Sequence, residues 1–146
     1  MINLFSRLNT LEEIECFFAP NGNSRGIFPV IGRVSIGNIE LEVLDGLSGH
    51  TAGQVFLYSR TSGLLFTVDS VFNFSSLSKE RADYSSLAAF LVTSVNVDSD
   101  MAKKERKGLL ELAQDTDNEL VSTGKHCLIC GVHGAVSVLD GGKLVA

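Results

Sequence analysis

The sequence lacks any long hydrophobic run. Among its 146 residues, no apolar stretch approaches the roughly 20 residues that a membrane-spanning helix needs. Residues 1–10 also lack a basic region followed by an apolar stretch and a small-residue cleavage site, so we expect no signal peptide. Together these absences predict a protein without a membrane partner.

Basic charge is scarce as well. The formal net charge is −5, and the one basic cluster, residues 103–107, contains a glutamate and falls within a predicted helix. Nucleic-acid binding requires basic side chains gathered on one face. We therefore interpret this cluster as a solvated helix face and expect no nucleic-acid partner.

Cysteine is limited to three residues, which cannot all pair within one chain. Cys127 and Cys130 have apolar neighbours, which favours reduced, buried thiols and a cytoplasmic location. With His126 nearby, the pair also suggests a zinc or redox site. Residues three apart on a strand point to opposite faces, however, so two thiols spaced like this could not share a metal ion.

Apolar residues, by contrast, are plentiful. They form 45% of the chain, and the mean hydropathy is +0.22, which is high for a domain of this size. The length fits a single domain spanning residues 1–146, with enough chain to bury a core. We interpret the apolar excess as a sign of a buried interface between chains.

Hydrophobic periodicity predicts a layered α/β domain. In residues 39–47, Ile39, Leu41 and Val43 alternate with glutamates, which is typical of a half-buried strand. Residues 99–117 carry a helical apolar stripe, with Ser99 or Asp100 as the cap. The complete prediction is helix 8–18, loop 19–26, strands 27–37, 39–47, 53–60 and 63–69, a helix around 83–91 in the middle of 76–95, helix 99–117, and strands 126–134, 135–140 and 143–146.

Two of these strands predict how the sheet is covered. Residues 53–60 and 63–69 are apolar on both faces at their centres. Such strands lie in sheets that are covered on both sides. We expect helices to supply that cover.

Three short motifs follow one another at the predicted strand ends. They are Ser48-Gly49-His50-Thr51-Ala52-Gly53, Leu65-Phe66-Thr67-Val68-Asp69 and Gly131-Val132-His133-Gly134. In order and spacing they resemble the C-terminal half of the metallo-β-lactamase superfamily, which includes glyoxalase II. The resemblance covers residues 27–146. It implies half of an αββα sandwich, with a mixed sheet and flanking helices.

The resemblance also implies metal ligands. His50 would bind one metal ion, Asp69 would bridge two, and His133 would bind the second. Imidazole and carboxylate ligands suit zinc, which lowers the pKa of a bound water and makes it a nucleophile.

The chain departs from the family pattern in three ways, one of which is Ser48 in place of the family's proline. Its three histidines cannot supply the family's first metal motif, His-x-His-x-Asp-His. Val68 also stands where the family has a glycine, although a branched side chain does not readily accept the backbone geometry that glycine allows. Each metal would keep one histidine and a shared carboxylate, whereas a catalytic zinc ion uses three protein ligands. We therefore expect no cofactor in the isolated chain, with zinc possible only if the site is completed.

Each candidate ligand has a structural alternative. His50 could simply hold the Gly-His-Thr-Ala-Gly turn through hydrogen bonds to the backbone. Asp69 could cap the loop after its strand. His133 could serve the packing of its own loop.

Two functions remain open. The first is a module that lacks hydrolase activity on its own and forms a homodimer, in which a second copy covers the apolar sheet face. The alternative is a zinc-dependent metallo-hydrolase acting on thioesters or related esters and amides. A missing N-terminal half or a partner chain would have to complete it.

Overall fold

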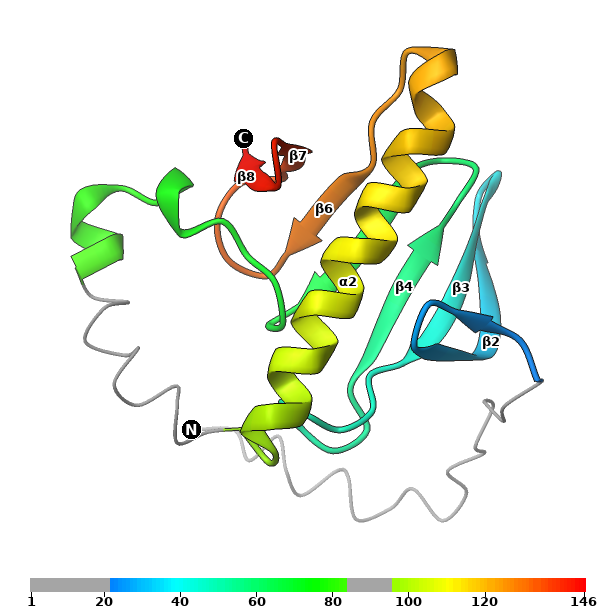
Figure 1. Ribbon diagram of the computed structural model, residues 1–146, viewed down its shortest axis with the longest axis horizontal. Coiled ribbons are helices and arrows are strands. Elements are labelled where there is room, and N and C mark those ends of the chain that lie inside the picture. Colours follow the sequence, from blue (N-terminus) through cyan, green and yellow to red (C-terminus); the bar gives the residue numbers. More distant parts are fainter. Residues whose placement is uncertain (1–21, 84–95) are drawn as a thin grey trace, which may run out of the picture.

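A six-stranded mixed sheet forms the centre of the computed structural model, which describes residues 22–83 and 96–146 (Figure 1). Its strands, in both chain order and spatial order, are β1 (Ser24–Arg25), β2 (Phe28–Ile36), β3 (Ile39–Asp45), β4 (Val55–Ser59), β5 (Leu64–Val68) and β6 (Leu128–Gly131). Neighbours from β1 to β5 are antiparallel, whereas β6 pairs with β5 in parallel. A separate hairpin, β7 (Val138–Asp140) and β8 (Lys143–Val145), follows.

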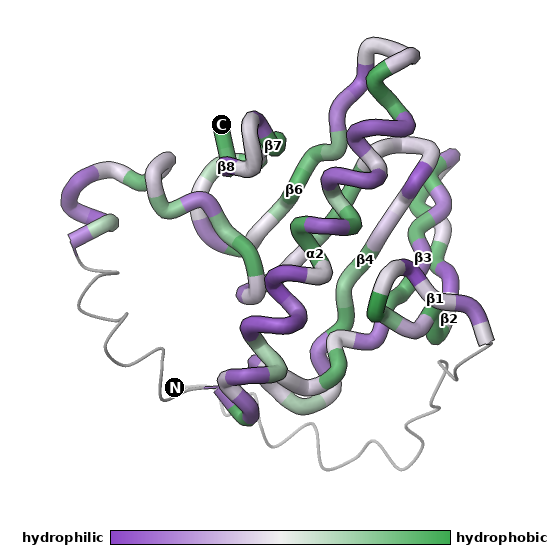
Figure 2. Tube along the Cα trace, viewed as in Figure 1, coloured by the Kyte–Doolittle hydropathy of each residue, from purple (hydrophilic) through white to green (hydrophobic). Residues whose placement is uncertain are grey.

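The long helix α2 (Ser99–Leu120) lies across one face of this sheet (Figure 1). The Asp98 carboxylate caps it by accepting hydrogen bonds from the amides of Asp100 and Met101, so the predicted cap was one or two residues too late. Polar and apolar residues alternate along the helix (Figure 2). Its buried apolar residues share one core with the sheet; this core includes Phe28, Val30, Leu44, Phe56, Tyr58, Leu65, Leu109, Leu112, Ala113 and Ile129.

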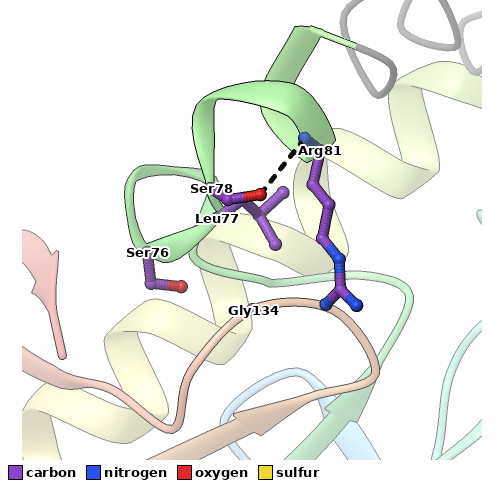
Figure 3. A pocket seen from close by; sticks show the side chains of 5 residues that line it. All are labelled: Ser76, Leu77, Ser78, Arg81 and Gly134. Atoms are coloured by element: carbon purple, nitrogen blue, oxygen red, sulfur yellow. Dashed lines mark hydrogen bonds between the residues drawn. The ribbon is translucent and has the colours of Figure 1, made fainter.

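Short helical segments follow β5 and α2. They are η2 (Phe74–Ser76), a helical stretch at residues 79–83, and η3 (Val121–Thr123). The Ser78 hydroxyl accepts a hydrogen bond from the Arg81 amide at 3.4 Å (Figure 3). This stretch touches the helix predicted around residues 83–91 only at residue 83. The rest of that helix and the helix predicted at 8–18 lie outside the described residues.

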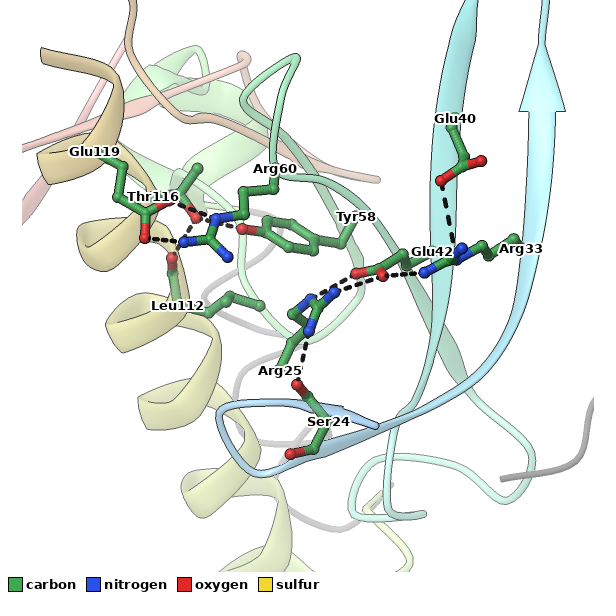
Figure 4. Close-up of polar contacts among 10 residues, drawn as sticks. All are labelled: Ser24, Arg25, Arg33, Glu40, Glu42, Tyr58, Arg60, Leu112, Thr116 and Glu119. Carbon is green, nitrogen blue, oxygen red and sulfur yellow. Dashed lines mark hydrogen bonds and ion pairs between the residues drawn. The ribbon is translucent and has the colours of Figure 1, made fainter. Parts of the chain in front are cut away.

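Polar contacts attach the sheet to the helix and to its own edge (Figure 4). The hydroxyls of Tyr58 and Thr116 lie 2.7 Å apart in the buried layer between β4 and α2. Arg25 holds the Glu42 carboxylate through two hydrogen bonds of 2.6 Å each. A bidentate arginine–carboxylate contact of this kind restricts the orientation of both side chains. The short strand β1 is therefore held to β3 across β2.

The sheet face opposite α2 is also apolar. Val43, Leu57, Phe66 and Cys130 lie directly opposite one another in successive strands. They alternate with residues that face α2, so their side chains point to the other side. Val43 is buried, and the other three are half-buried.

The predicted fold class is wrong. We expected half of an αββα sandwich with helices flanking the sheet, but the described residues form a mostly β structure with one long helix on one face. The error has a physical cause, because apolar residues on both faces of a strand indicate burial without specifying what covers each face. In addition, the closing strands form their own two-stranded sheet and do not extend the main one.

No helix in residues 22–83 or 96–146 is long and apolar enough to cross a bilayer.

Candidate functional site

Asp69 and His133 meet at one edge of the sheet. Asp69 directly follows β5, and His133 lies two residues beyond the end of β6. Because β5 and β6 are parallel neighbours, their carboxyl ends lie side by side. His133 Nε2 is 3.5 Å from Asp69 Oδ1, and the side chains are 61% and 40% exposed. The structure thus brings together two of the three candidate ligands in an open, water-accessible position.

Aromatic packing supports one side of this pair. The ring of Phe72 stands edge-on to the His133 imidazole, with centroids 5.8 Å apart. Phe72 also packs against Phe74, with centroids 4.3 Å apart. These contacts restrict the His133 ring while leaving its Nε2 atom beside Asp69.

His50 has a different neighbour. Its Nδ1 atom lies 2.8 Å from Asn96 Oδ1. Within residues 22–83 and 96–146, no three His, Cys, Asp or Glu side chains are grouped so that they could hold a metal ion. The described side chains therefore supply at most a two-ligand site at Asp69 and His133, which is fewer than the three that a catalytic zinc ion uses.

The turn that carries His50 is fixed to α2. The buried Glu105 carboxylate accepts a 2.7 Å hydrogen bond from the Gly49 amide. The Gly49 and His50 carbonyls accept hydrogen bonds from Asp98 and Val97 at 2.9 and 3.1 Å. Burial raises the pKa of Glu105, while the amides of Gly49 and His50 act in the opposite direction. The turn is thus held by Glu105 and by its own backbone groups, whereas the His50 side chain contacts Asn96 and not the backbone of the turn.

Arg106, the next residue of α2, holds the segment that follows Asp69. Arg106 Nε donates to the Ser70 carbonyl at 3.1 Å, immediately after Asp69. Gln54 Nε2 donates to the Ser70 hydroxyl at 2.7 Å. Two consecutive residues of α2 therefore position both ligand-bearing segments, and sequence reasoning missed both.

Val68 has a backbone conformation that valine rarely adopts. Its φ is 50°, in the left-handed region, where a β-branched side chain is strained. This is the position where the resemblance implies a glycine. The residue is nevertheless packed against the core, so the fold holds valine in a conformation suited to glycine.

We expect the Val68→Gly variant to be more stable than Val68→Ala by about 1 kcal/mol, because a Cβ atom is costly in the left-handed region. In ordinary strand conformation the order is reversed, with alanine favoured by about 0.5–1 kcal/mol. Urea unfolding followed by circular dichroism measures the difference. The same two substitutions at Ser35, an exposed residue of β2, provide the control. An alanine advantage at both positions would contradict the strain.

The two described cysteines differ in their burial. Cys127 is buried, and burial raises the pKa of its thiol to about 12. Cys130 is half-buried on β6, and both are free thiols. His126 Nδ1 lies 2.9 Å from Asp117 Oδ1, so this histidine is engaged at the end of α2. Burial thus surrounds the Cys127 thiol, and Asp117 engages His126.

No protein-family model matches this chain, and no curated protein is similar to it at a significant level.

Proposed function

We propose that this chain is a non-catalytic, dimerising module related to the metallo-β-lactamase superfamily. The apolar sheet face opposite α2 is the observation that supports the proposal. Its central row of Val43, Leu57, Phe66 and Cys130 crosses four strands without a charged side chain. Leu128, at the edge of the same face, is 37% exposed. Val43 is buried, but Leu57, Phe66 and Cys130 stay partly exposed, and an apolar patch that remains exposed is typical of an interaction surface.

A second copy of the chain is the occupant that fits best. The chain carries a net charge of −5, so two copies repel one another unless they meet where charge is absent. The apolar face provides such a place. In a twofold interface the same patch serves both partners, and two uncharged rows can lie against each other without burying an unpaired charge.

The expected result is a mass of twice 15.7 kDa, or 31.4 kDa, in light scattering coupled to size exclusion. Replacing Leu128 with glutamate should shift the equilibrium towards monomer by at least about tenfold, because two like charges would face each other across the interface. Leu128 is suited to this test, since it lies on the edge strand β6 and is already partly exposed.

Val121→Glu is the matched control. Val121 is an apolar residue, 63% exposed, in η3 beyond the end of α2. The Val121→Glu substitution adds the same charge away from the sheet face, so it should leave the mass in solution unchanged. A mass of 15.7 kDa for the natural chain at every concentration would contradict dimerisation. Equal effects of the two glutamates would contradict the location of the interface.

The second candidate function is a zinc-dependent hydrolase completed by another chain. The 3.5 Å approach of His133 to Asp69 favours it, because two ligands already lie together at the strand ends. These two side chains would hold the metal ion, and zinc would supply a nucleophilic water. A zinc titration of the natural chain and of the Asp69→Asn variant separates the two candidate functions, because the dimerising module needs no metal ion.

The cytoplasm is the proposed location. Both described cysteines are free, and one of them is deeply buried. Free thiols persist most readily in a reducing compartment.

A further inference from the structure

A cavity of about 400 Å³ lies between the segment after η2 and the loop after β6, where Gly134 follows His133 in the sequence (Figure 3). Its lining consists of Ser76, Leu77, Ser78, Arg81 and Gly134. Such a volume suits a small molecule. We propose that this cavity binds the oxyanion group of a small organic molecule, as a phosphate monoester or a carboxylate. The proposal is independent of dimerisation.

Contacts within the protein join the two segments that line the cavity. The Ser76 hydroxyl donates to the Asn73 carbonyl and accepts from the Ala135 amide, both at 2.7 Å. Asn73 Nδ2 donates to the Ser137 hydroxyl at 2.9 Å. These bonds join η2 to the loop after β6, so the two walls are held together without a ligand.

Gly134 permits this close approach. Its φ is +84°, and a Cβ atom there would lie 2.5 Å from the Asn73 carbonyl oxygen and 2.9 Å from Ser76 Oγ. A larger residue would therefore push the two walls apart. The glycine that closes the last motif thus shapes the cavity.

The hydrogen-bond donors available to a ligand come from one side. The Ser76 hydroxyl proton is already committed to Asn73, whereas the Ser78 hydroxyl accepts from the Arg81 amide and keeps its own proton to donate. The Arg81 side chain extends towards Gly134 across the opening (Figure 3). Among the described residues, the ion pairs at the nearby acidic side chains are Lys79–Asp83 and His133–Asp69, and neither includes Arg81.

This arrangement selects a class of ligand. A guanidinium presents a planar fork of N–H donors that matches phosphate and carboxylate oxygens. Ser78 adds a neutral donor, and Leu77 adds an apolar wall for the carbon part of the molecule. The net charge of −5 repels anions from most of the protein surface. Binding of an anion therefore reports on the cavity itself.

The test is a titration of ¹⁵N-labelled full-length protein with phenyl phosphate, benzoate and neutral benzyl alcohol at constant ionic strength. We expect phenyl phosphate or benzoate to shift the signals of Arg81 Nε and the Gly134 amide, and the tighter of the two identifies the oxyanion. Benzyl alcohol should bind at least about tenfold more weakly, because it offers no charge to the guanidinium.

Arg81→Gln should weaken oxyanion binding by about tenfold or more, and Arg81→Lys should weaken it less, because the charge remains while the fork is lost. Lys79→Gln is the matched control: it removes one positive charge from the same helical segment, where Lys79 pairs with Asp83 outside the cavity lining. It should change binding by less than about twofold. Equal binding by Arg81→Gln and the natural chain, equal binding of benzyl alcohol, or no shift up to the solubility limit would overturn the proposal.

Discussion

Leu109→Ala is expected to lower the free energy of unfolding by about 3–5 kcal/mol. Leu109 is fully buried at the centre of the core that α2 shares with the sheet. The substitution removes apolar contacts and leaves a cavity between two layers whose positions are fixed by polar ties such as Tyr58–Thr116. Layers fixed in this way cannot collapse easily, which places the expected cost towards the upper end of the usual range.

Leu110→Ala is the matched control for this experiment. Leu110 is the next residue of the same helix, is half-buried, and packs only against the margin of the core. Both substitutions change helix propensity equally, so the difference between them reports on burial alone. We expect Leu110→Ala to cost about 1 kcal/mol. Urea unfolding at a fixed protein concentration, followed at 222 nm, measures both. Equal losses would mean that α2 does not present its Leu109 face to the sheet.

Glu105→Ala should be the second most damaging change, at about 2–4 kcal/mol. The substitution removes the acceptor of the Gly49 amide and leaves a buried N–H group without a partner. The substitution also leaves an empty space, because the Glu105 side chain is fully buried in the natural chain. Because the same carboxylate holds the turn before His50, we expect hydrogen exchange at Gly49 and His50 to accelerate more than exchange elsewhere.

Glu111→Ala is the control, since Glu111 lies on the same helix with an exposed side chain near Lys107. It should cost less than about 0.5 kcal/mol. Glu105→Gln should retain much of the stability, because its amide oxygen can still accept from Gly49. A loss no larger for Glu105→Ala than for Glu111→Ala would contradict the role of the buried carboxylate.

The Glu105 contact also predicts a pH dependence. Burial raises the pKa of Glu105 above its ordinary value of 4.5, so the folded protein binds the proton at a higher pH than the unfolded chain. The stability of the natural chain relative to Glu105→Gln should therefore be greatest below pH 4.5 and should fall as the pH rises through the folded-state pKa. Taking the difference cancels the other carboxylates. A difference that grows with pH would show that the amide hydrogen bonds outweigh burial.

Local patterns predicted the elements well. The alternation of Ile39, Leu41 and Val43 with glutamates corresponds to β3, and the apolar stripe at 99–117 corresponds to α2. The motifs were predicted at strand ends, and Asp69 and His133 lie just beyond the ends of β5 and β6. Their approach depends on β5 and β6 being parallel neighbours, a long-range pairing that no local period encodes.

The rest of the site could not be predicted for the same reason. Glu105 shares a helical stripe with Ala102, Leu109 and Leu112, and that spacing was a usable signal for a buried carboxylate. Its partner, the Gly49 amide, lies 56 residues away. Arg106 belongs to the basic run at 103–107, which we interpreted as solvated, yet its Nε atom binds the Ser70 carbonyl. Charge patterns describe a surface on average and do not identify the one side chain that turns inward.

The parallel pairing of β5 with β6 has a consequence for how the chain folds. Strands β2 to β5 pair with their sequence neighbours through short connections, so they can form early. Strand β6 must find β5 across 64 positions, from Leu64 to Leu128, so we expect this pairing to form later. His133 therefore reaches Asp69 only at the end of this process, and the Asp69–His133 pair marks completed folding rather than its beginning.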